Sequence, residues 1–169
     1  MNYEQARAYA VNVSRSGSIL GLDSIENLMH ELGDIQERLK IIHIAGTNGK
    51  GSTGAYLERV LIEAGYRVGR YSSPAVFDPM EVWRINLQSM SHEEYADIME
   101  QVKCACDRMV EKGMEHPTIF EVETAMAFLY FYQKKCDYVL LEVGMGGRTD
   151  ATNVIRKPVC SVITSVSMD

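Results

Sequence analysis

The chain has 169 residues, of which 46% are hydrophobic and 24% charged, and it carries a formal net charge of −6. This composition is typical of a globular domain with a hydrophobic core, and the acidic excess argues against nucleic acid as a partner. No apolar run approaches the roughly 20 residues that a bilayer-spanning helix needs. Residues 1–13 lack a signal peptide's basic leader and apolar run, and the four cysteines form no CxxC pair. We therefore expect a cytoplasmic protein with reduced thiols and no membrane partner.

Helical and strand patterns alternate along the chain. Apolar residues at helical spacing predict helices over 23–33, 51–65, 91–113 and 117–133. Capping pairs are expected at three helix starts: Asp23 with Glu26, Ser91 with Glu94, and Thr118 with Glu121. Short β-rich runs predict strands over 40–46, 66–71, 137–143 and 158–167, the last two covered on both faces. This order predicts an α/β fold with a doubly wound, mostly parallel sheet, which binds ligands at the carboxyl ends of its strands.

A glycine-rich stretch, GTNGKGSTG at residues 46–54, lies between a predicted strand and a predicted helix. Small residues let backbone N–H groups approach phosphates there, and a helix N-terminus adds the positive end of its dipole. Lys50 supplies a charge for terminal phosphates, and Ser52 and Thr53 supply hydroxyls for a phosphate oxygen or a metal. The usual phosphate-loop spelling has Ser or Thr directly after Lys, whereas Gly51 intervenes here. A plain turn is the alternative, but the lysine and two hydroxyls favour a nucleotide site.

A second stretch, LLEVGMGGRTDATN at residues 140–153, supports the same interpretation. Glu142 ends a predicted buried strand, at the sheet edge where the glycine-rich loop also lies. A carboxylate there suits Mg²⁺, which is a hard cation and takes oxygen ligands. Alone, Glu142 would be read as a surface residue at a strand end. Together with the loop, it predicts a Mg²⁺-nucleotide site.

These stretches resemble the folylpolyglutamate synthase/dihydrofolate synthase family of the Mur ligase superfamily. The family's loop is spelled G-T-N-G-K-G-S, as at residues 46–52, with glycine between the lysine and the hydroxyl. YSSPAVFDPMEVWRIN is similar to its T-S-P-H-L…E-R-I…N segment. TIFEVETAMAFLYF and LEVGMGGRTDATN are similar to its F-E-x-x-T-A-x-A-F and L-E-V-G-L-G-G-R-x-D-A-T-N motifs. GLDSIENLMHELG and ITSVSMD also match in order, so the resemblance covers essentially the whole chain.

The resemblance implies a set of site residues. Those implied to hold the ATP phosphates are Thr47, Asn48, Gly49, Lys50, Gly51 and Ser52. Ser73 and Glu142 match metal ligands, and Phe120 and Asp150 match the region that receives the pterin-bearing substrate. Lys50 and Glu142 are the implied catalytic pair. The sequence departs from the family at Ala75, where His is usual, and at Val82, where Arg is usual.

The resemblance further implies a doubly wound α/β fold like a Mur ligase central domain, here truncated. Residues 1–169 would be the N-terminal part of the ATP-binding domain, without its remainder and without the C-terminal domain. The full-length enzyme, expected to be a monomer, would add L-glutamate to folate or dihydropteroate through an acyl phosphate, using ATP and Mg²⁺. The isolated chain is expected to be inactive. Three alternatives remain at this point: a Mur-type peptidoglycan ligase, a nucleotide-binding P-loop protein without ligase activity, and a degenerate, non-catalytic relative. The intact Lys50, Ser73 and Glu142 argue against the third.

Overall fold

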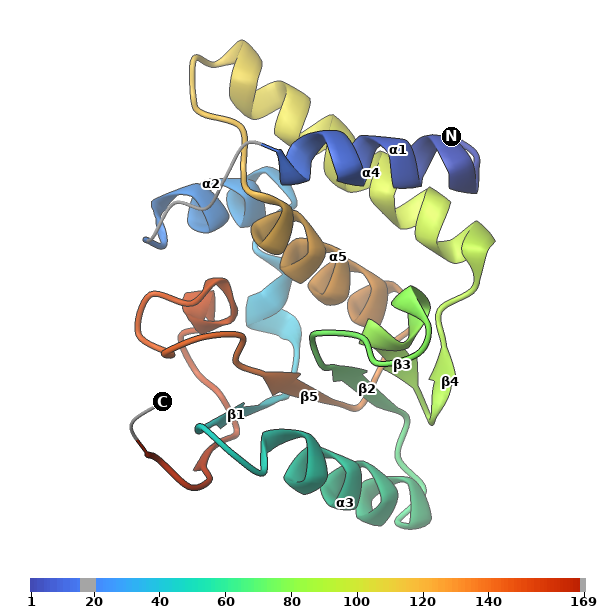
Figure 1. Ribbon diagram of the computed structural model, residues 1–169, viewed down its shortest axis with the longest axis vertical. Coiled ribbons are helices and arrows are strands. Elements are labelled where there is room, and N and C mark those ends of the chain that lie inside the picture. The colour runs from blue at the N-terminus through green and yellow to red at the C-terminus, as the bar shows by residue number, and fades with distance from the viewer. Residues whose placement is uncertain (16–20, 168–169) are drawn as a thin grey trace.

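A computed structural model describes residues 1–15 and 21–167, which form a six-stranded sheet with helices on both faces (Figure 1). The strand order across the sheet is β4-β3-β2-β5-β1-β6. The strands are β1 (Ile41–Ala45), β2 (Val68–Tyr71), β3 (Trp83–Ile85), β4 (Gln88–Ser89), β5 (Tyr138–Glu142) and β6 (Cys160–Ile163). The predicted α/β fold is confirmed.

The four strands at the centre and one side of the sheet are parallel. β5 pairs with β2 and β1, and β1 pairs with β6, all in parallel, whereas β3 runs antiparallel to β2 and β4 antiparallel to β3. Ile44 lies opposite Glu142, and Tyr71 opposite Leu141. This register brings the carboxyl ends of β1, β2 and β5 to one edge, as the sequence predicted for a ligand site.

Helices cover the sheet unequally. α3 (Lys50–Glu63) lies on one face, and α5 (Ile119–Gln133) lies on the other, as Figure 1 shows. Outside α5 pack α1 (Tyr3–Ser14), α2 (Asp23–Glu31) and α4 (His92–Glu111). Short 3₁₀ turns are η1 (Ile35–Arg38), η2 (Pro79–Val82) and η3 (Ala151–Val154). Among the helices described, none combines the length and apolar character needed to cross a bilayer.

The alternation of side chains along the strands divides the core in two. Val139 and Leu141 of β5 belong to the large cluster on the α5 side. Leu140, between them, joins Ile44 and Val68 in a smaller cluster beneath α3. Residues of odd and even position therefore face different helices. By the same rule, Glu142 at the end of β5 lies on the α3 side.

Helix starts partly match the sequence predictions. The capping boxes of Ser91 with Glu94 and Thr118 with Glu121 are present. The expected pair at Asp23 is wrong, because α2 begins at Asp23 itself and its N-cap is Leu22, without a side-chain capping bond. α1 was not predicted, although its start carries a capping box formed by Asn2 and Gln5.

The last strand differs most from its prediction. β6 is the four-residue strand Cys160–Ile163 at the sheet edge, and the side chain of Ile163 is 72% exposed. The prediction of a strand covered on both faces is therefore wrong for β6, while it holds for β5.

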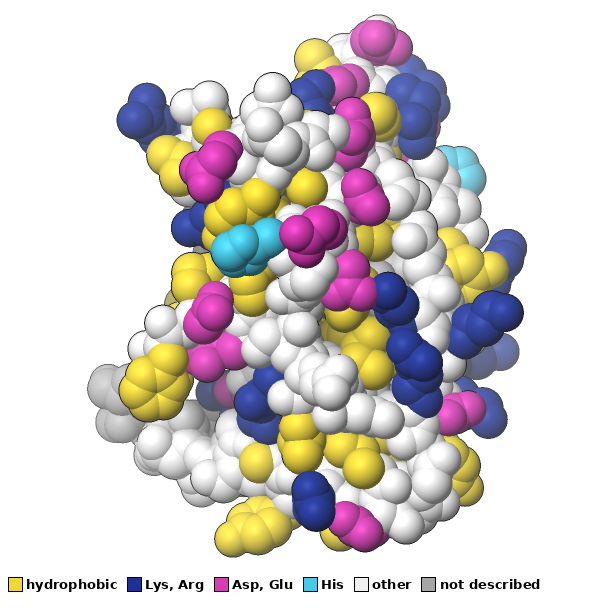
Figure 2. Space-filling model, turned by 90° about the vertical axis from the view of Figure 1, so that its right-hand side faces the viewer, with side chains coloured by type: hydrophobic (Ala, Val, Ile, Leu, Met, Phe, Trp, Pro, Cys, Tyr) yellow, Lys and Arg dark blue, Asp and Glu magenta, His cyan; other side chains and the backbone are white. Residues whose placement is uncertain are grey.

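On the face drawn in Figure 2, acidic and basic side chains lie interspersed, a mixture typical of a solvated surface.

Candidate functional site

The glycine-rich loop joins β1 to α3 with backbone angles that favour glycine. Gly46 has φ +136° and Gly49, the N-cap of α3, has φ +87°. A Cβ at Gly46 would lie 2.0 Å from Thr164 Oγ1, so only glycine fits there. α3 begins at Lys50, and no described side chain caps it. The backbone N–H groups of a helix's first turn lack intrahelical acceptors, so this end of α3 is suited to bind an anion.

The outer rim of the loop is held by the segment that follows β6. The backbone N–H of Thr47 donates to the Ser165 carbonyl at 2.8 Å, and the Ser165 hydroxyl donates to the Asn48 carbonyl at 3.1 Å. The N–H of Ser167 donates to Thr47 Oγ1 at 3.2 Å. Residues 165–167 thus fix Thr47 and Asn48, and sequence reasoning had given this segment no such role.

Lys50 lies across the loop. Its Nζ donates a hydrogen bond to the Gly46 carbonyl at 2.8 Å, in a half-buried position. Ser52, two residues on, is exposed and leaves its hydroxyl accessible at the start of the helix. The ammonium, the hydroxyl and the first-turn N–H groups therefore gather at the mouth of the loop.

At the neighbouring strand ends, a carboxylate meets a hydroxyl. Ser72 follows β2, and its Oγ donates to Glu142 Oε2 at 2.8 Å. Ser73 comes next in the chain, and Tyr71, two residues before it, has a phenol whose pKa is raised by burial. The structure thus brings the predicted pair Ser73 and Glu142 to one sheet edge, and it adds Ser72 as the residue in contact with the carboxylate.

The residues assigned to the substrate also come together. A Cβ at Gly144 would lie 2.6 Å from Phe120 Cζ and 3.1 Å from Asp150 Oδ2, so both side chains pack against this glycine. Asp150 is buried. Its Oδ2 accepts from the Met145 N–H at 2.8 Å, and its Oδ1 accepts from the Thr152 N–H at 3.0 Å. The Asp150 carboxylate therefore shapes the loop of residues 144–150.

His43, on β1, extends this network and was missed from the sequence. Its Nε2 lies 2.9 Å from Thr152 Oγ1, and the Thr152 hydroxyl donates its proton to Asp150 Oδ1. His43 Nε2 must then be the donor toward Thr152, which fixes the tautomer. Burial lowers the pKa of His43 and favours its neutral form. Strand alternation places the side chains of His43 and Ile44 on different faces of the sheet. The sequence could therefore have indicated the face on which His43 lies, but not its contact with Thr152.

Aromatic and acidic side chains line the start of α5 near these residues. The ring of Tyr71 lies between those of Phe120 and Trp83, with centroid separations of 6.5 and 6.3 Å. Glu123 is one helical turn beyond Phe120. Burial raises its pKa to about 7, and the charge of Arg7 opposes that shift. This carboxyl group therefore titrates near neutrality.

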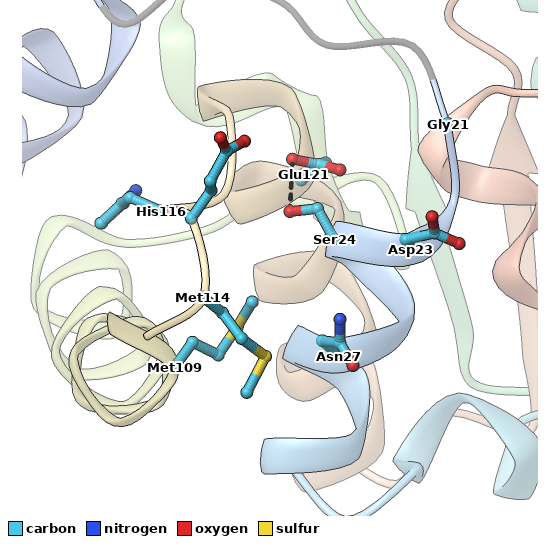
Figure 3. Close-up of a pocket in the computed structure, with 9 residues that line it drawn as sticks. Gly21, Asp23, Ser24, Asn27, Met109, Met114, His116 and Glu121 are labelled. Atoms are coloured by element: carbon cyan, nitrogen blue, oxygen red, sulfur yellow. Dashed lines mark hydrogen bonds between the residues drawn. The ribbon is translucent and has the colours of Figure 1, made fainter. Parts of the chain in front are cut away.

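A cavity of about 320 Å³ opens between α2, the end of α4 and the start of α5 (Figure 3). Its lining combines the thioethers of Met109 and Met114 with acidic and polar side chains. At one wall, the Ser24 hydroxyl donates to Glu121 Oε2 at 3.1 Å. Glu121 also accepts from the Thr118 N–H at 2.7 Å, so it ties α2 to the start of α5.

The two departures from the family pattern lie in the segment after Ser73. Val82 is buried at the end of η2, and Ala75 packs against the large core cluster. Between them, the side chain of Phe77 is 93% exposed, and the N–H groups of Val76 and Phe77 both donate to Glu81 Oε1. Val82 thus serves packing, and the loop tip carries the exposed apolar surface.

No protein-family model matches the chain. The chain is 39% identical over 168 residues to the dihydrofolate synthase/folylpolyglutamate synthase of Bacillus subtilis, a match covering 99% of this chain and 39% of that protein. A bifunctional folylpolyglutamate synthase/dihydrofolate synthase, solved with Mn, AMPPNP and L-glutamate bound, gives a TM-score of 0.86 at 38% identity, covering 97% of this chain and 39% of that one. A folylpolyglutamate synthase complex with AMPPCP and folate gives a TM-score of 0.91 at 36% identity, and the match covers 100% of this chain and 41% of that one.

The mostly parallel sheet and the strand, glycine-rich loop and helix at its carboxyl edge define an α/β protein of the phosphate-loop class. The proteins to which the chain is similar identify its family within this class. The chain belongs to the folylpolyglutamate synthase/dihydrofolate synthase family, and it spans 39% of the length of the Bacillus relative.

Proposed function

We propose that this chain is the N-terminal part of the ATP-binding domain of a ligase that joins L-glutamate to folate or dihydropteroate. The observation that carries the proposal is the loop of residues 46–52, which opens α3 with two positive-φ glycines and Lys50 folded across it. It is supported by relatives that were solved with nucleotide analogues, L-glutamate and folate. Their greater length supports a continuation of this domain and a C-terminal domain, as expected from the resemblance.

ATP is the proposed phosphate donor, and the residues present fit its phosphates. The N–H groups of Asn48 to Ser52, including those of the first turn of α3, would surround the phosphate oxygens, while Thr47, whose own N–H is bonded to the Ser165 carbonyl, would shape the loop around them. Lys50, now bonded to the Gly46 carbonyl, can exchange that contact for a terminal phosphate. Preorganised positive groups of this kind stabilise charge that develops as a phosphoryl group moves to a carboxylate. No covalent nucleophile is required of the chain.

Ser73 and Glu142 are the proposed Mg²⁺ ligands. Among the residues described, no group of three or more His, Cys, Asp or Glu gathers to hold a metal ion. A pair of oxygen donors nevertheless fits Mg²⁺, which commonly binds one or two protein ligands and completes its shell with water and substrate phosphates. When bound, Mg²⁺ supplies positive charge to the phosphate oxygens. The Ser72 hydroxyl orients the Glu142 carboxylate toward that role.

Phe120 is the proposed contact for the pterin-bearing substrate, with Asp150 acting through the loop that it shapes. Both residues pack on Gly144, at the same sheet edge as Glu142. Lys50 and Glu142 are accordingly the proposed catalytic residues. We further propose a cytoplasmic, monomeric full-length enzyme, in keeping with the free cysteines Cys104, Cys106, Cys136 and Cys160.

The test is to purify the full-length protein and measure ADP release with L-glutamate and either dihydropteroate or a folate. Turnover that requires both the pterin compound and glutamate supports the proposal, and comparison of the two compounds separates the two synthase activities. Turnover with UDP-linked cell-wall precursors instead would assign a Mur-type ligase. Nucleotide binding without any ligation would assign a P-loop protein of another function.

A further inference from the structure

A buried arginine contacts the first turn of the phosphate-loop helix from the neighbouring strand. Arg70 lies on β2, where alternation places it on the α3 side with Val68. Its side chain is only 8% exposed. The Nη2 group donates to the Gly51 carbonyl at 2.8 Å, and Nη1 donates to Glu58 Oε2 at 3.2 Å. Arg70 therefore joins the residue directly after Lys50 to a point two turns further along α3.

Two glycines make room for this guanidinium. Gly51, Gly54 and Glu58 follow helical spacing and form one stripe of α3 that faces β2. A Cβ at Gly54 would lie 3.3 Å from Arg70 Nε, and one at Gly51 would lie 3.9 Å from Nη2. The planar group thus lies close against the helix backbone. This arrangement gives a structural use to Gly51, the residue that separates Lys50 from Ser52.

Glu58 holds the arginine in place. Its side chain is fully buried, and the cost of burying that carboxylate is offset by the Arg70 guanidinium. Its other oxygen, Oε1, accepts from the Leu87 N–H at 3.3 Å, in the turn between β3 and β4. Arg84 Nη2 approaches Glu58 Oε2 at 3.9 Å, but in the part of the chain that the structure describes it donates no hydrogen bond to the loop. Glu58 therefore fixes Arg70 from one side, while the Gly51 carbonyl receives it on the other.

We propose that Arg70 is a positioning residue for the phosphate loop, one that sets the affinity for MgATP by fixing the first turn of α3. The inference rests on the proposed function of that loop and adds a residue outside it. The fork of Arg70 bonds the Gly51 carbonyl and Glu58 at once. A lysine keeps the charge opposite Glu58 but cannot make both bonds in this geometry.

The test compares two conservative substitutions, Arg70→Lys and Arg84→Lys, in the full-length protein. Both preserve a positive charge near Glu58, but only the first removes the bond to the first turn. We expect Arg70→Lys to weaken binding of the Mg²⁺ complex of AMPPNP about tenfold or more, the usual effect of losing a charge-assisted hydrogen bond. The KM for ATP should rise accordingly, while the KM for L-glutamate stays within about twofold. Arg84→Lys should leave AMPPNP affinity within about twofold, and melting temperatures report any general loss of stability for both.

The outcomes separate this inference from the proposed function. Equal losses of AMPPNP affinity in Arg70→Lys and Arg84→Lys would show that the buried ion pair acts through stability alone, and would overturn the positioning role. Unchanged affinity in Arg70→Lys would overturn it too. If the unaltered protein binds no nucleotide, the proposed function falls and this inference falls with it. The inference is supported if Arg70→Lys, but not Arg84→Lys, loses affinity for AMPPNP while the KM for L-glutamate is unchanged.

Discussion

Ser72 Oγ donates a hydrogen bond of 2.8 Å to Glu142 Oε2, joining the carboxyl ends of two neighbouring parallel strands. The bond leaves the second carboxylate oxygen of Glu142 for another partner, and it restricts the rotation of the side chain. Groups that orient a metal ligand commonly matter nearly as much as the ligand. Ser72 is therefore the residue through which the proposed metal site is most simply tested.

We expect Ser72→Ala in the full-length enzyme to raise the Mg²⁺ concentration for half-maximal activity about tenfold, because the Glu142 carboxylate loses its orientation. Glu142→Ala should raise it further, since it removes a ligand. Ser89→Ala, on the exposed strand β4, is the matched control and should change nothing. The measurement is activity against Mg²⁺ at saturating ATP and folate. A shift in the folate titration instead would place Ser72 and Glu142 in the substrate site.

Lys50→Ala should lower turnover on the order of a hundredfold or more, because the ammonium contributes most as the phosphoryl group moves. The fold should be little affected, since within residues 1–15 and 21–167 the Nζ group makes a single hydrogen bond, to the Gly46 carbonyl at 2.8 Å. Lys157→Ala, at an exposed position, controls for the loss of one surface charge. The check is kcat for ADP release together with the melting temperature. An unaltered kcat would remove Lys50 from the phosphate site.

How far the sequence predicts this site depends on how local each signal is. The loop of residues 46–52, the strands β1 and β5 and the helices α3 to α5 were predicted, because glycine clusters and apolar periodicity lie within one continuous stretch. The pairs Ser72–Glu142 and Arg70–Gly51 were not. Each pair depends on which elements lie next to β2 and on the register between them. That information is not contained in any continuous stretch of the sequence.

Other elements were missed because their patterns are weak. β3 and β4 have three and two residues, too few to show alternation. α1 buries Ala6, Ala10 and Val13, a stripe of small side chains with little hydrophobic contrast, although the capping box at Asn2 marks its start. The exposure of β6 could not be predicted either, since apolar residues suggest burial whatever lies beside them.

Glu123 gives a stability change with a defined direction in pH. Burial raises its pKa to about 7 in the folded state, above its ordinary value of 4.5. The folded protein therefore holds this proton more tightly than the unfolded chain does. The resulting stability is fully present below about pH 4.5 and is lost as the pH rises through about 7.

Glu123→Gln removes this titration. We expect the variant to gain stability relative to the unaltered protein as the pH rises from 5 to 8, by roughly 1–3 kcal/mol at the upper end. Glu111→Gln, on the exposed side of α4, should show no such trend. Denaturant unfolding at several pH values provides the measurement. A difference between Glu123→Gln and the unaltered protein that is constant from pH 5 to 8 would contradict the assignment.

Gly46→Ala should be among the most damaging substitutions in the loop, for two separable reasons. Its φ of +136° disfavours any side chain, and its Cβ would lie 2.0 Å from Thr164 Oγ1 and 3.1 Å from the Ser165 carbonyl oxygen. Gly113→Ala isolates the first reason, because Gly113 has φ +80° with no atom within 4 Å of the added Cβ. We expect Gly113→Ala to cost about 1–2 kcal/mol of unfolding free energy, and Gly46→Ala about 3 kcal/mol or more.

The double variant Gly46→Ala with Thr164→Ala divides the Gly46 effect between backbone strain and collision. Removing Thr164 Oγ1 relieves the closest contact, but the Ser165 carbonyl and the positive φ remain. The double variant should therefore recover part of the lost stability. Its free energy of unfolding should still be lower than that of the Thr164→Ala single variant, by more than the amount that Gly113→Ala costs. Nucleotide affinity should follow the same order, because the displaced segment at residues 165–167 also holds Thr47 and Asn48. Full recovery in the double variant would show that the Gly46 backbone is not strained, and that Thr164 alone demands a glycine at this position.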